Sequence, residues 1–212
     1  MRYTKKEAVR IVTSAAKDYR DSLEGRNFLF IFRNRENNHI EYFEAIFLPR
    51  NFQHLTGIET LDKDGNIEKT PGLFYERCLT GKLSESMICF RPDGTTFMKL
   101  EALSRIVNFV SSSKMTGLYN GCKPLLAVDR LAGTTNFCLG FTRDRNYYVP
   151  SSCLLEDIRN LAEKPSQILA VMSKNSGEKT YQNVRYVAKG LPFDKLVLPA
   201  DLERIVERRR TC

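Results

Sequence analysis

Histidine is the first residue type to consider, because its imidazole side chain ordinarily titrates near neutral pH, with a pKa of about 6.5. The 212-residue sequence contains two histidines, His39 and His54. His54 lies in the segment 51–58, which we predict to be a loop in which Thr56 and Gly57 let the backbone approach a ligand closely. His39 falls in a predicted hairpin turn. His54 is therefore the first candidate for acid–base chemistry; the alternative is a ring that caps a helix or bonds a carbonyl group.

A second group of candidates lies near the C-terminal end, where cations and phenols follow a predicted hairpin. Tyr181 and Arg185 share one parity of the last strand, and Tyr186 has the other, more apolar parity. We therefore predict that Tyr181 and Arg185 occupy an open face, next to Lys174 and Lys179 of the preceding turn. Such a face can hold phosphate and stack a base. An ordinary half-exposed strand is the alternative interpretation.

Arginines and aromatic residues are also interleaved between positions 143 and 152, a mixture that single-stranded nucleic acid binding uses. The chain carries 33 Lys and Arg against 25 Asp and Glu, a net charge of +8, so an anionic partner such as nucleic acid is a reasonable expectation. A generic solvated surface accounts for the same charge. The candidate binding residues are Thr56, Arg143, Arg145, Tyr148, Ser151 and Tyr186.

Metal and cofactor motifs are missing from the sequence. None of the six cysteines forms a C-x-x-C pair or has a histidine at metal-ligand spacing, so we expect reduced thiols and no metal site. The phosphate-binding patterns G-x-x-x-x-G-K-[ST] and G-x-G-x-x-G do not occur. We therefore expect no cofactor.

The elements that must position these residues can be predicted from capping and periodicity. Thr4 and Glu7 form a capping box before an amphipathic helix that continues to Tyr19. Two strands at 27–35 and 39–48 form a hairpin, and further helices are predicted at 70–81 and from 96 onward. Strands are predicted at 124–129, 135–142, 146–149, 167–173 and 180–189, residues 150–152 cap a short helix near 156–162, and the last helix covers 201–210.

Strands in this prediction mostly follow strands through short loops, which favours antiparallel pairing and an α+β fold. We expect helices that precede and pack on a curved, mainly antiparallel sheet. Residues 1–212 would form one domain, in which the helix and hairpin of 1–48 could be a subdomain, 49–190 the core and 191–212 a C-terminal helix. The longest apolar run, 28–32, is too short for a membrane span, and the N-terminal stretch is not apolar, so we expect a cytoplasmic protein without a membrane partner.

The segment 51–57, NFQHLTG, resembles the N-F-x-H-L-T-G signature of a phage and mobile-element family of Gram-positive bacteria. That family is grouped with barnase, EndoU, colicin tRNases and RelE as BECR-type nucleases. Further similar positions are 74–79, 81–83, 99–100, 139–141, 148–152 and 179–181 with the nearby Tyr186. The resemblance covers about residues 40–190.

The resemblance implies helices before a curved sheet whose face binds RNA, and cleavage without a metal ion. A base would take the proton of a ribose 2′-OH, that oxygen would attack the phosphate, and cations would stabilise the charge that develops. By the same resemblance, His54 would act as acid or base, Lys174 or Lys179 with Arg185 would hold phosphate, and Tyr181 would stack or donate. EndoU-like enzymes pair two histidines, and nothing in the sequence places His39 near His54.

Three hypotheses follow from the sequence. The protein could be a metal-independent endoribonuclease acting on RNA, a non-catalytic nucleic-acid-binding accessory on the same fold, or a regulatory or immunity module that binds a protein. A protein inhibitor or partner is compatible with each of them, and the sequence does not specify an oligomeric state.

Overall fold

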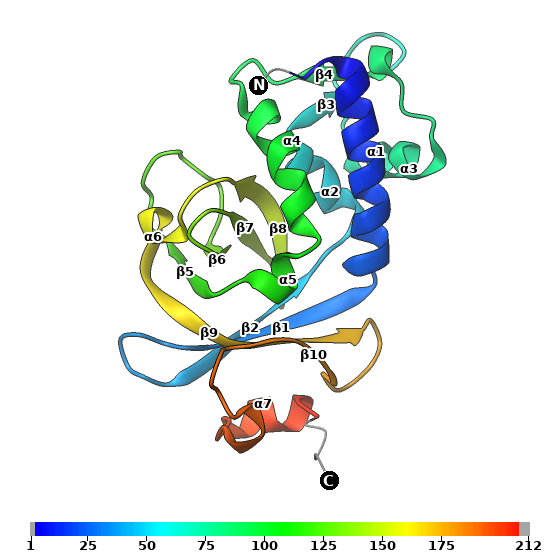
Figure 1. Cartoon of the computed structure of the whole chain (residues 1–212). Coiled ribbons are helices and arrows are strands. Elements are labelled where there is room, and N and C mark those ends of the chain that lie inside the picture. Colours follow the sequence, from blue (N-terminus) through cyan, green and yellow to red (C-terminus); the bar gives the residue numbers. More distant parts are fainter. Residues whose placement is uncertain (1–2, 208–212) are drawn as a thin grey trace.

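A computed structural model describes residues 3–207 of the chain. A layer of helices packs against a strongly curved sheet, and a short C-terminal helix covers the opposite side of that sheet (Figure 1). The helices are α1 (Lys5–Ser22), α2 (Pro49–Thr56), α3 (Pro71–Thr80), α4 (Thr95–Ile106), α5 (Phe109–Ser112), α6 (Ile158–Leu161) and α7 (Ala200–Ile205). Short 3-10 turns occupy Glu85–Met87 and Phe193–Lys195.

The main sheet closes on itself. Its strands are β1 (Arg26–Arg33), β2 (Ile40–Ile46), β5 (Met115–Tyr119), β6 (Arg130–Gly133), β7 (Cys138–Asp144), β8 (Tyr147–Leu154), β9 (Ala162–Asn175) and β10 (Asn183–Val187). Their order is β1-β2-β8-β7-β6-β5-β9-β10, and β9 also pairs with β1, which closes the ring. The predicted α+β class with a curved, mainly antiparallel sheet is confirmed, and the curvature goes as far as closing the sheet into a barrel.

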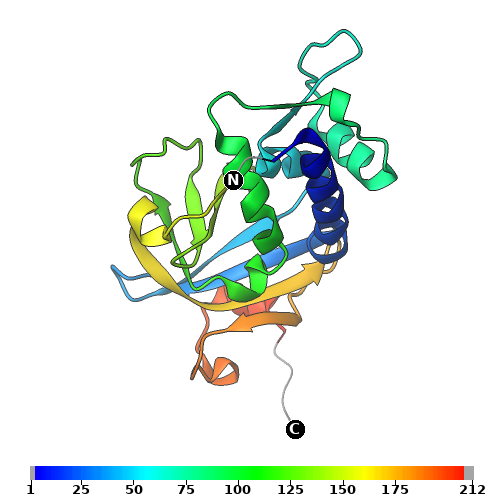
Figure 2. The same ribbon diagram turned by 45° about the horizontal axis from the view of Figure 1, so that its top comes forward.

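All neighbouring strands of the closed sheet are antiparallel except at one seam. There β2 and β8 run parallel and share a single bridge between Ala45 and Tyr148, whereas β1 and β9 pair over eight positions. A separate small sheet joins β3 (Ile58–Thr60) to β4 (Ile88–Phe90) next to α2. Figure 2 shows the helices above the closed sheet from a second direction.

The N-terminal helix begins as its sequence predicts. The Thr4 hydroxyl accepts a hydrogen bond from the Glu7 amide at 3.2 Å, and the Glu7 carboxylate accepts one from the Thr4 amide at 2.8 Å. The buried stripe of α1 ends at Tyr19, whose ring makes edge contacts with Phe47 and Phe52. Aromatic pairs in this geometry add to the stability that burial alone provides.

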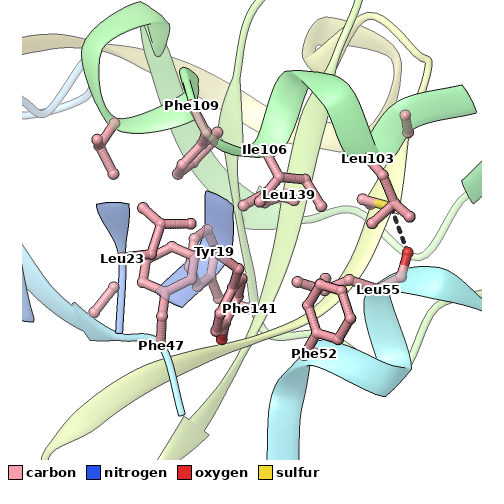
Figure 3. Close-up of a cluster of buried hydrophobic side chains, with 14 of the residues drawn as sticks. Tyr19, Leu23, Phe47, Phe52, Leu55, Leu103, Ile106, Phe109, Leu139 and Phe141 are labelled. Carbon is pink, nitrogen blue, oxygen red and sulfur yellow. Dashed lines mark hydrogen bonds between the residues drawn. The ribbon is translucent and has the colours of Figure 1, made fainter. Parts of the chain in front are cut away.

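Both faces of β1 are buried, and this explains its uninterrupted apolar sequence. Phe28 and Phe30 face the main core, which also contains Phe47, Phe109 and Phe141 (Figure 3). The alternate residues of β1 and β9 face a second cluster, which α7 and the segment before it cover. This cluster contains Leu29, Ile31, Ala170, Met172, Tyr181, Leu198, Leu202 and Val206. A strand with two covered faces needs apolar residues at consecutive positions.

Most predicted elements are confirmed, but several predictions are wrong or differ in extent. The segment 51–58 is not a loop: it contains most of α2, which begins at Pro49 and ends before Gly57 at φ 65°. Residues 124–129 form no strand, and 150–152 lie inside β8, so the residue that caps α6 is Asp157. The last predicted helix is shorter, since α7 ends at Ile205, and positions 208–212 lie outside the described residues. Within residues 3–207, none of the helices is long and apolar enough to cross a membrane.

Candidate active site around His54

His54 lies in the last turn of α2, with its side chain directed outward. The residues around it on the helix, Phe52, Gln53, Leu55 and Thr56, are buried, whereas His54 is exposed. Proline at the first helical position and a left-handed glycine after the last one define the ends of this helix. The segment therefore presents one imidazole at a fixed place on the surface, at the C-terminal end of a short rigid helix.

The start of α4 packs directly against this end of α2. The buried Lys99 ammonium donates a hydrogen bond to the backbone carbonyl of His54 at 2.7 Å. Thr96 donates from its hydroxyl to the Gly57 carbonyl at 2.6 Å and accepts from the Arg91 amide at 3.0 Å. A Cβ atom at position 57 would lie 3.0 Å from the Thr96 Cα atom, so this close approach and the φ of 65° both favour glycine here.

Two positive charges act on the His54 imidazole. Partial burial lowers the pKa of His54 below its usual 6.5, and the nearby Lys99 and Arg91 cations lower it further. The Arg91 guanidinium lies 3.6 Å from the Glu59 carboxylate, and Asp93 lies close enough to affect Lys99. At neutral pH the imidazole is therefore uncharged and can accept a proton, beside two cations that could stabilise an anion.

The thiol behind the site is not a nucleophile. Cys153 of β8 is fully buried and donates a hydrogen bond from Sγ to the Leu55 carbonyl at 3.2 Å, the dashed line of Figure 3. Burial raises the pKa of Cys153 to about 12, so the thiol stays protonated at neutral pH. This contact instead fixes α2 against the closed sheet.

Thr56 is also part of this framework. It is buried, donates from its hydroxyl to the Gln53 carbonyl at 2.8 Å, and accepts from the Ile58 amide at 3.0 Å. Its side chain therefore fixes the end of α2. The predicted role of Thr56 in binding a ligand then depends on its backbone alone.

The predicted open face of the C-terminal hairpin is wrong for Tyr181. The Tyr181 ring is fully buried, its hydroxyl donates to the Glu44 carboxylate, and the Lys174 ammonium lies 4.5 Å from the ring centroid. A bulge between Val184 and Tyr186 breaks the strict alternation along β10 on which the prediction rested. Tyr181 itself precedes β10 and pairs with Val206 instead.

Arg185 and Tyr186 lie in different surroundings. Arg185 is exposed, donates from Nε to the Ser173 hydroxyl at 2.8 Å, and lines a cavity of about 420 Å³ together with Met172 and Phe193. Tyr186 is half-buried against the main core, and the Lys114 ammonium lies 4.0 Å from its ring centroid. Neither His54 nor a residue of α4 lines the cavity of Arg185.

The β7–β8 hairpin holds the remaining candidates. Arg143 and Arg145 are exposed at its turn, where Arg145 adopts a φ of 55° and its carbonyl accepts from Arg143 Nε at 3.3 Å. The Ser151 hydroxyl forms a hydrogen bond with Thr142 at 2.9 Å. Tyr148 packs edge-on against a core phenylalanine, and the Arg130 guanidinium lies 5.7 Å from its ring centroid.

The structure therefore separates the predicted site residues into distinct groups. His54 lies with Lys99 and Arg91, whereas Lys174 and Tyr181 lie together near the start of β10. His39 begins the approach to β2 and His54 follows its other end, so a strand of roughly 20 Å separates the two histidines. They do not form a pair.

The sequence prediction did not identify Lys99 and Arg91 as site residues. Lys99 belongs to one of the short segments that carried the family resemblance, and this was the one available signal. Arg91 precedes a Pro-Asp-Gly turn that is typical of a surface loop. Among residues 3–207, no three His, Cys, Asp or Glu side chains gather in a way that could hold a metal ion.

In a comparison with protein-family models, residues 11–190 match a family model. The matching family is described as phage-Barnase-EndoU-ColicinE5/D-RelE like nuclease4. A search of curated proteins and a search of solved structures each gave no match. The match includes α2, α4 and all of the strands described above, and so contains the whole His54 group.

Proposed function

This chain belongs to the phage-Barnase-EndoU-ColicinE5/D-RelE like nuclease 4 family, and on that premise we propose that it is an endoribonuclease that cleaves RNA without a metal ion. The observation that carries the proposal is the surface-facing His54 imidazole, whose neutral form is favoured by partial burial and then by the Lys99 and Arg91 cations. A neutral imidazole next to fixed positive charge suits the removal of a proton followed by the stabilisation of an anion.

The reaction proposed is an internal transesterification of the phosphodiester. His54 accepts the proton of a ribose 2′-OH, and the 2′-oxygen forms a bond to the adjacent phosphorus atom. The bond from phosphorus to the 5′-oxygen breaks, and the leaving oxygen takes a proton from solvent. Lys99 and Arg91 stabilise the additional negative charge on the phosphoryl oxygens. The products are a 2′,3′-cyclic phosphate and a free 5′-hydroxyl group.

The exposed cations of the two hairpins supply contacts to the substrate in this proposal. Lys179 and Arg185 near β10, with Arg143 and Arg145 at the β7–β8 turn, would bind phosphates away from the reacting one. Contacts of this kind position a nucleic acid without reading its sequence. Tyr181 is assigned a structural role, because a ring without exposed surface cannot touch RNA in this conformation.

The test compares the two histidines of the chain. Purified protein is incubated with total RNA in the presence of EDTA, and the products are analysed for 2′,3′-cyclic phosphate ends. We expect His54→Gln to lose about 10²- to 10⁴-fold in cleavage rate, the usual contribution of a general base. His39→Gln is the matched control, because His39 is exposed in the β1–β2 turn, and it should cleave like the unaltered protein.

Three results would contradict this proposal. Absence of cleavage at high protein concentration would remove the enzymatic function, and full activity of His54→Gln would remove the assigned base. Loss of cleavage in EDTA that Mg²⁺ restores would show that the reaction needs a metal ion.

A second candidate is a non-catalytic protein that binds nucleic acid. The observation that favours it is the separation of His39 from His54 by the length of β2, which leaves the site with a single histidine. This function predicts binding that weakens steeply with salt, because bound phosphates release counterions, together with no cleavage product.

A further inference from the structure

A cavity far from His54 collects positive charge. It lies where the turn of the β1–β2 hairpin meets the start of β5 and the middle of β9, and its volume is about 580 Å³. The lining side chains used below are Arg33, Arg35, Asn38, Lys114, Gln167 and Tyr186, and we name this surface the basic groove. Pockets that enclose ligands have similar volumes, commonly about 300–1,000 Å³.

The three cations of the basic groove have no acidic partner in the described part of the chain. Arg33, Arg35 and Lys114 form none of the ion pairs found within residues 3–207, and no carboxylate lines the groove. The two nearest acidic residues of the hairpin are already engaged. Glu36 pairs with Lys164, and Glu41 accepts hydrogen bonds from the amide side chains of Asn34 and Asn37.

Local contacts hold the side chains of Arg33 and Lys114 and the backbone of Arg35. The Arg33 guanidinium lies 3.4 Å from both the backbone and the side-chain oxygen of Asn38. The Lys114 ammonium lies over the Tyr186 ring at 4.0 Å, a favourable cation–π geometry. The Arg35 amide donates to the Ser166 hydroxyl at 3.1 Å, which ties the hairpin turn to β9. The charged groups of Arg33 and Lys114 are therefore positioned before any ligand binds, and the backbone contact fixes where the Arg35 side chain begins.

We propose that the basic groove binds the phosphate backbone of a single-stranded nucleic acid. Where that nucleic acid is RNA, the inference rests on the proposed function. Proteins that bind single strands combine a positively charged groove with aromatic side chains, and the groove offers both. Its concave shape suits one strand better than the convex surface of a duplex. The groove lies at the opposite end of the β1–β2 hairpin from α2, so it is a second contact surface rather than part of the His54 site.

The test measures binding apart from cleavage. A fluorescently labelled 2′-O-methyl oligonucleotide serves as the probe, because it lacks the 2′-OH that the proposed reaction requires. Its dissociation constant is measured at several salt concentrations for the full chain and for the triple variant Arg33→Gln, Arg35→Gln, Lys114→Gln. A control triple variant, Lys6→Gln, Arg10→Gln, Lys17→Gln, removes the same charge from the exposed face of α1. Circular dichroism confirms that both variants fold.

The expected result has a defined size. Removal of three phosphate contacts should reduce the slope of log K against log salt by about 2, since each contact to a single strand contributes about 0.7. The same relation predicts binding on the order of 100-fold weaker at 0.1 M salt. The α1 variant should keep the slope of the full chain. Unlabelled single-stranded RNA and DNA of the same sequence should compete, and a duplex should compete less well.

The remaining outcomes distinguish a failure of this inference from a failure of the proposed function. If the full chain does not bind the probe, or if the groove variant binds like the α1 variant, the inference is overturned, even when RNA is cleaved. If the groove variant loses binding but the full chain never cleaves RNA, the inference stands and the endoribonuclease proposal fails. Binding of an acidic polypeptide with no competition from the single strands would assign the groove to a protein and overturn the inference.

Discussion

The protonation state of His54 determines what its imidazole can do at neutral pH. Burial, Lys99 and Arg91 all lower its pKa, so the neutral form persists to a lower pH than for a free histidine. A base with this property loses activity only when the pH falls through the lowered pKa. We therefore expect the His54 signal in an NMR titration to have its midpoint below 6.5, and the acidic limb of the cleavage rate to follow the same midpoint.

The Arg91→Gln variant tests the cause of this shift. Removal of the cation removes one contribution that lowers the pKa, so the His54 midpoint should move to higher pH. The NMR signal of His54 is assigned as the histidine signal that is absent from the spectrum of His54→Gln. A midpoint at or above 6.5 in the unaltered chain, or no change in Arg91→Gln, would show that these cations do not control the imidazole.

Tyr181 illustrates a different use of a polar side chain. Its buried hydroxyl donates to the Glu44 carboxylate, and burial and this carboxylate raise the pKa of the phenol, so it remains protonated. Tyr181→Phe should lower the free energy of unfolding by about 1.5–3 kcal/mol, the usual value for a hydrogen bond to a charged group. Tyr42→Phe is the control, because its hydroxyl bonds the Asp201 carboxylate at the surface and should matter less. Denaturant unfolding measures the free energy of unfolding of both variants. Equal losses of this free energy in Tyr181→Phe and Tyr42→Phe, or slower cleavage by Tyr181→Phe, would contradict the structural role of Tyr181.

At the residue scale, the sequence was informative about His54 and uninformative about its neighbours. His54 could be selected because the chain has two histidines and one stands in a recognisable motif. Lys99 looks like an ordinary helix lysine in the sequence, and its burial against the His54 carbonyl depends on how α4 packs on α2. Contacts between residues 45 positions apart are set by packing, which periodicity and spacing do not describe.

At the scale of elements, the position of His54 depends on how α2 ends. Gly57 follows this helix with φ 65°, and a Cβ atom there would lie 3.0 Å from the Thr96 Cα atom. Gly81 ends α3 with φ 69° and has open space around it. Both Gly→Ala variants should lose about 1–2 kcal/mol from the left-handed backbone. Gly57→Ala should lose about 1–3 kcal/mol more, as overpacked sites do, and should also slow cleavage.

Thermal or denaturant unfolding of the two alanine variants checks this difference. Equal destabilisation would mean that α4 moves freely to accommodate the extra carbon atom. In that case, the close contact between α2 and α4 would not be what fixes His54.

Elements with strong local signals were predictable, and α2 was not. The capping box of α1 and the Thr-Pro start of α3 with its terminal glycine are visible in the sequence. A proline and a glycine also mark the two ends of α2. In the sequence, however, Pro49 could equally be the residue that terminates the preceding strand. A helix of eight residues shows little periodicity, so the ambiguity could not be resolved from the sequence.

At the scale of the whole molecule, the closure of the sheet could not be predicted from the sequence. The antiparallel hairpins were visible, whereas the pairing of β1 with β9 joins residues more than 130 positions apart. The consecutive apolar residues of β1 could have indicated a strand covered on both sides. What covers the second side is the C-terminal segment, which lies beyond the residue 190 at which the family match ends.

The described C-terminal segment should therefore stabilise the whole fold, although the family match does not include it. Val206 is 8% exposed within the second cluster, next to Tyr181, and backbone hydrogen bonds join Tyr181 to Ile205 and Glu207. Val197 in the same segment is 83% exposed. Val206→Ala removes buried methyl groups and should lower the free energy of unfolding by about 1.5–3 kcal/mol, whereas Val197→Ala should stay within about 0.5 kcal/mol. Denaturant unfolding of the two variants gives the comparison, and equal values would show that this segment does not hold the closed sheet together.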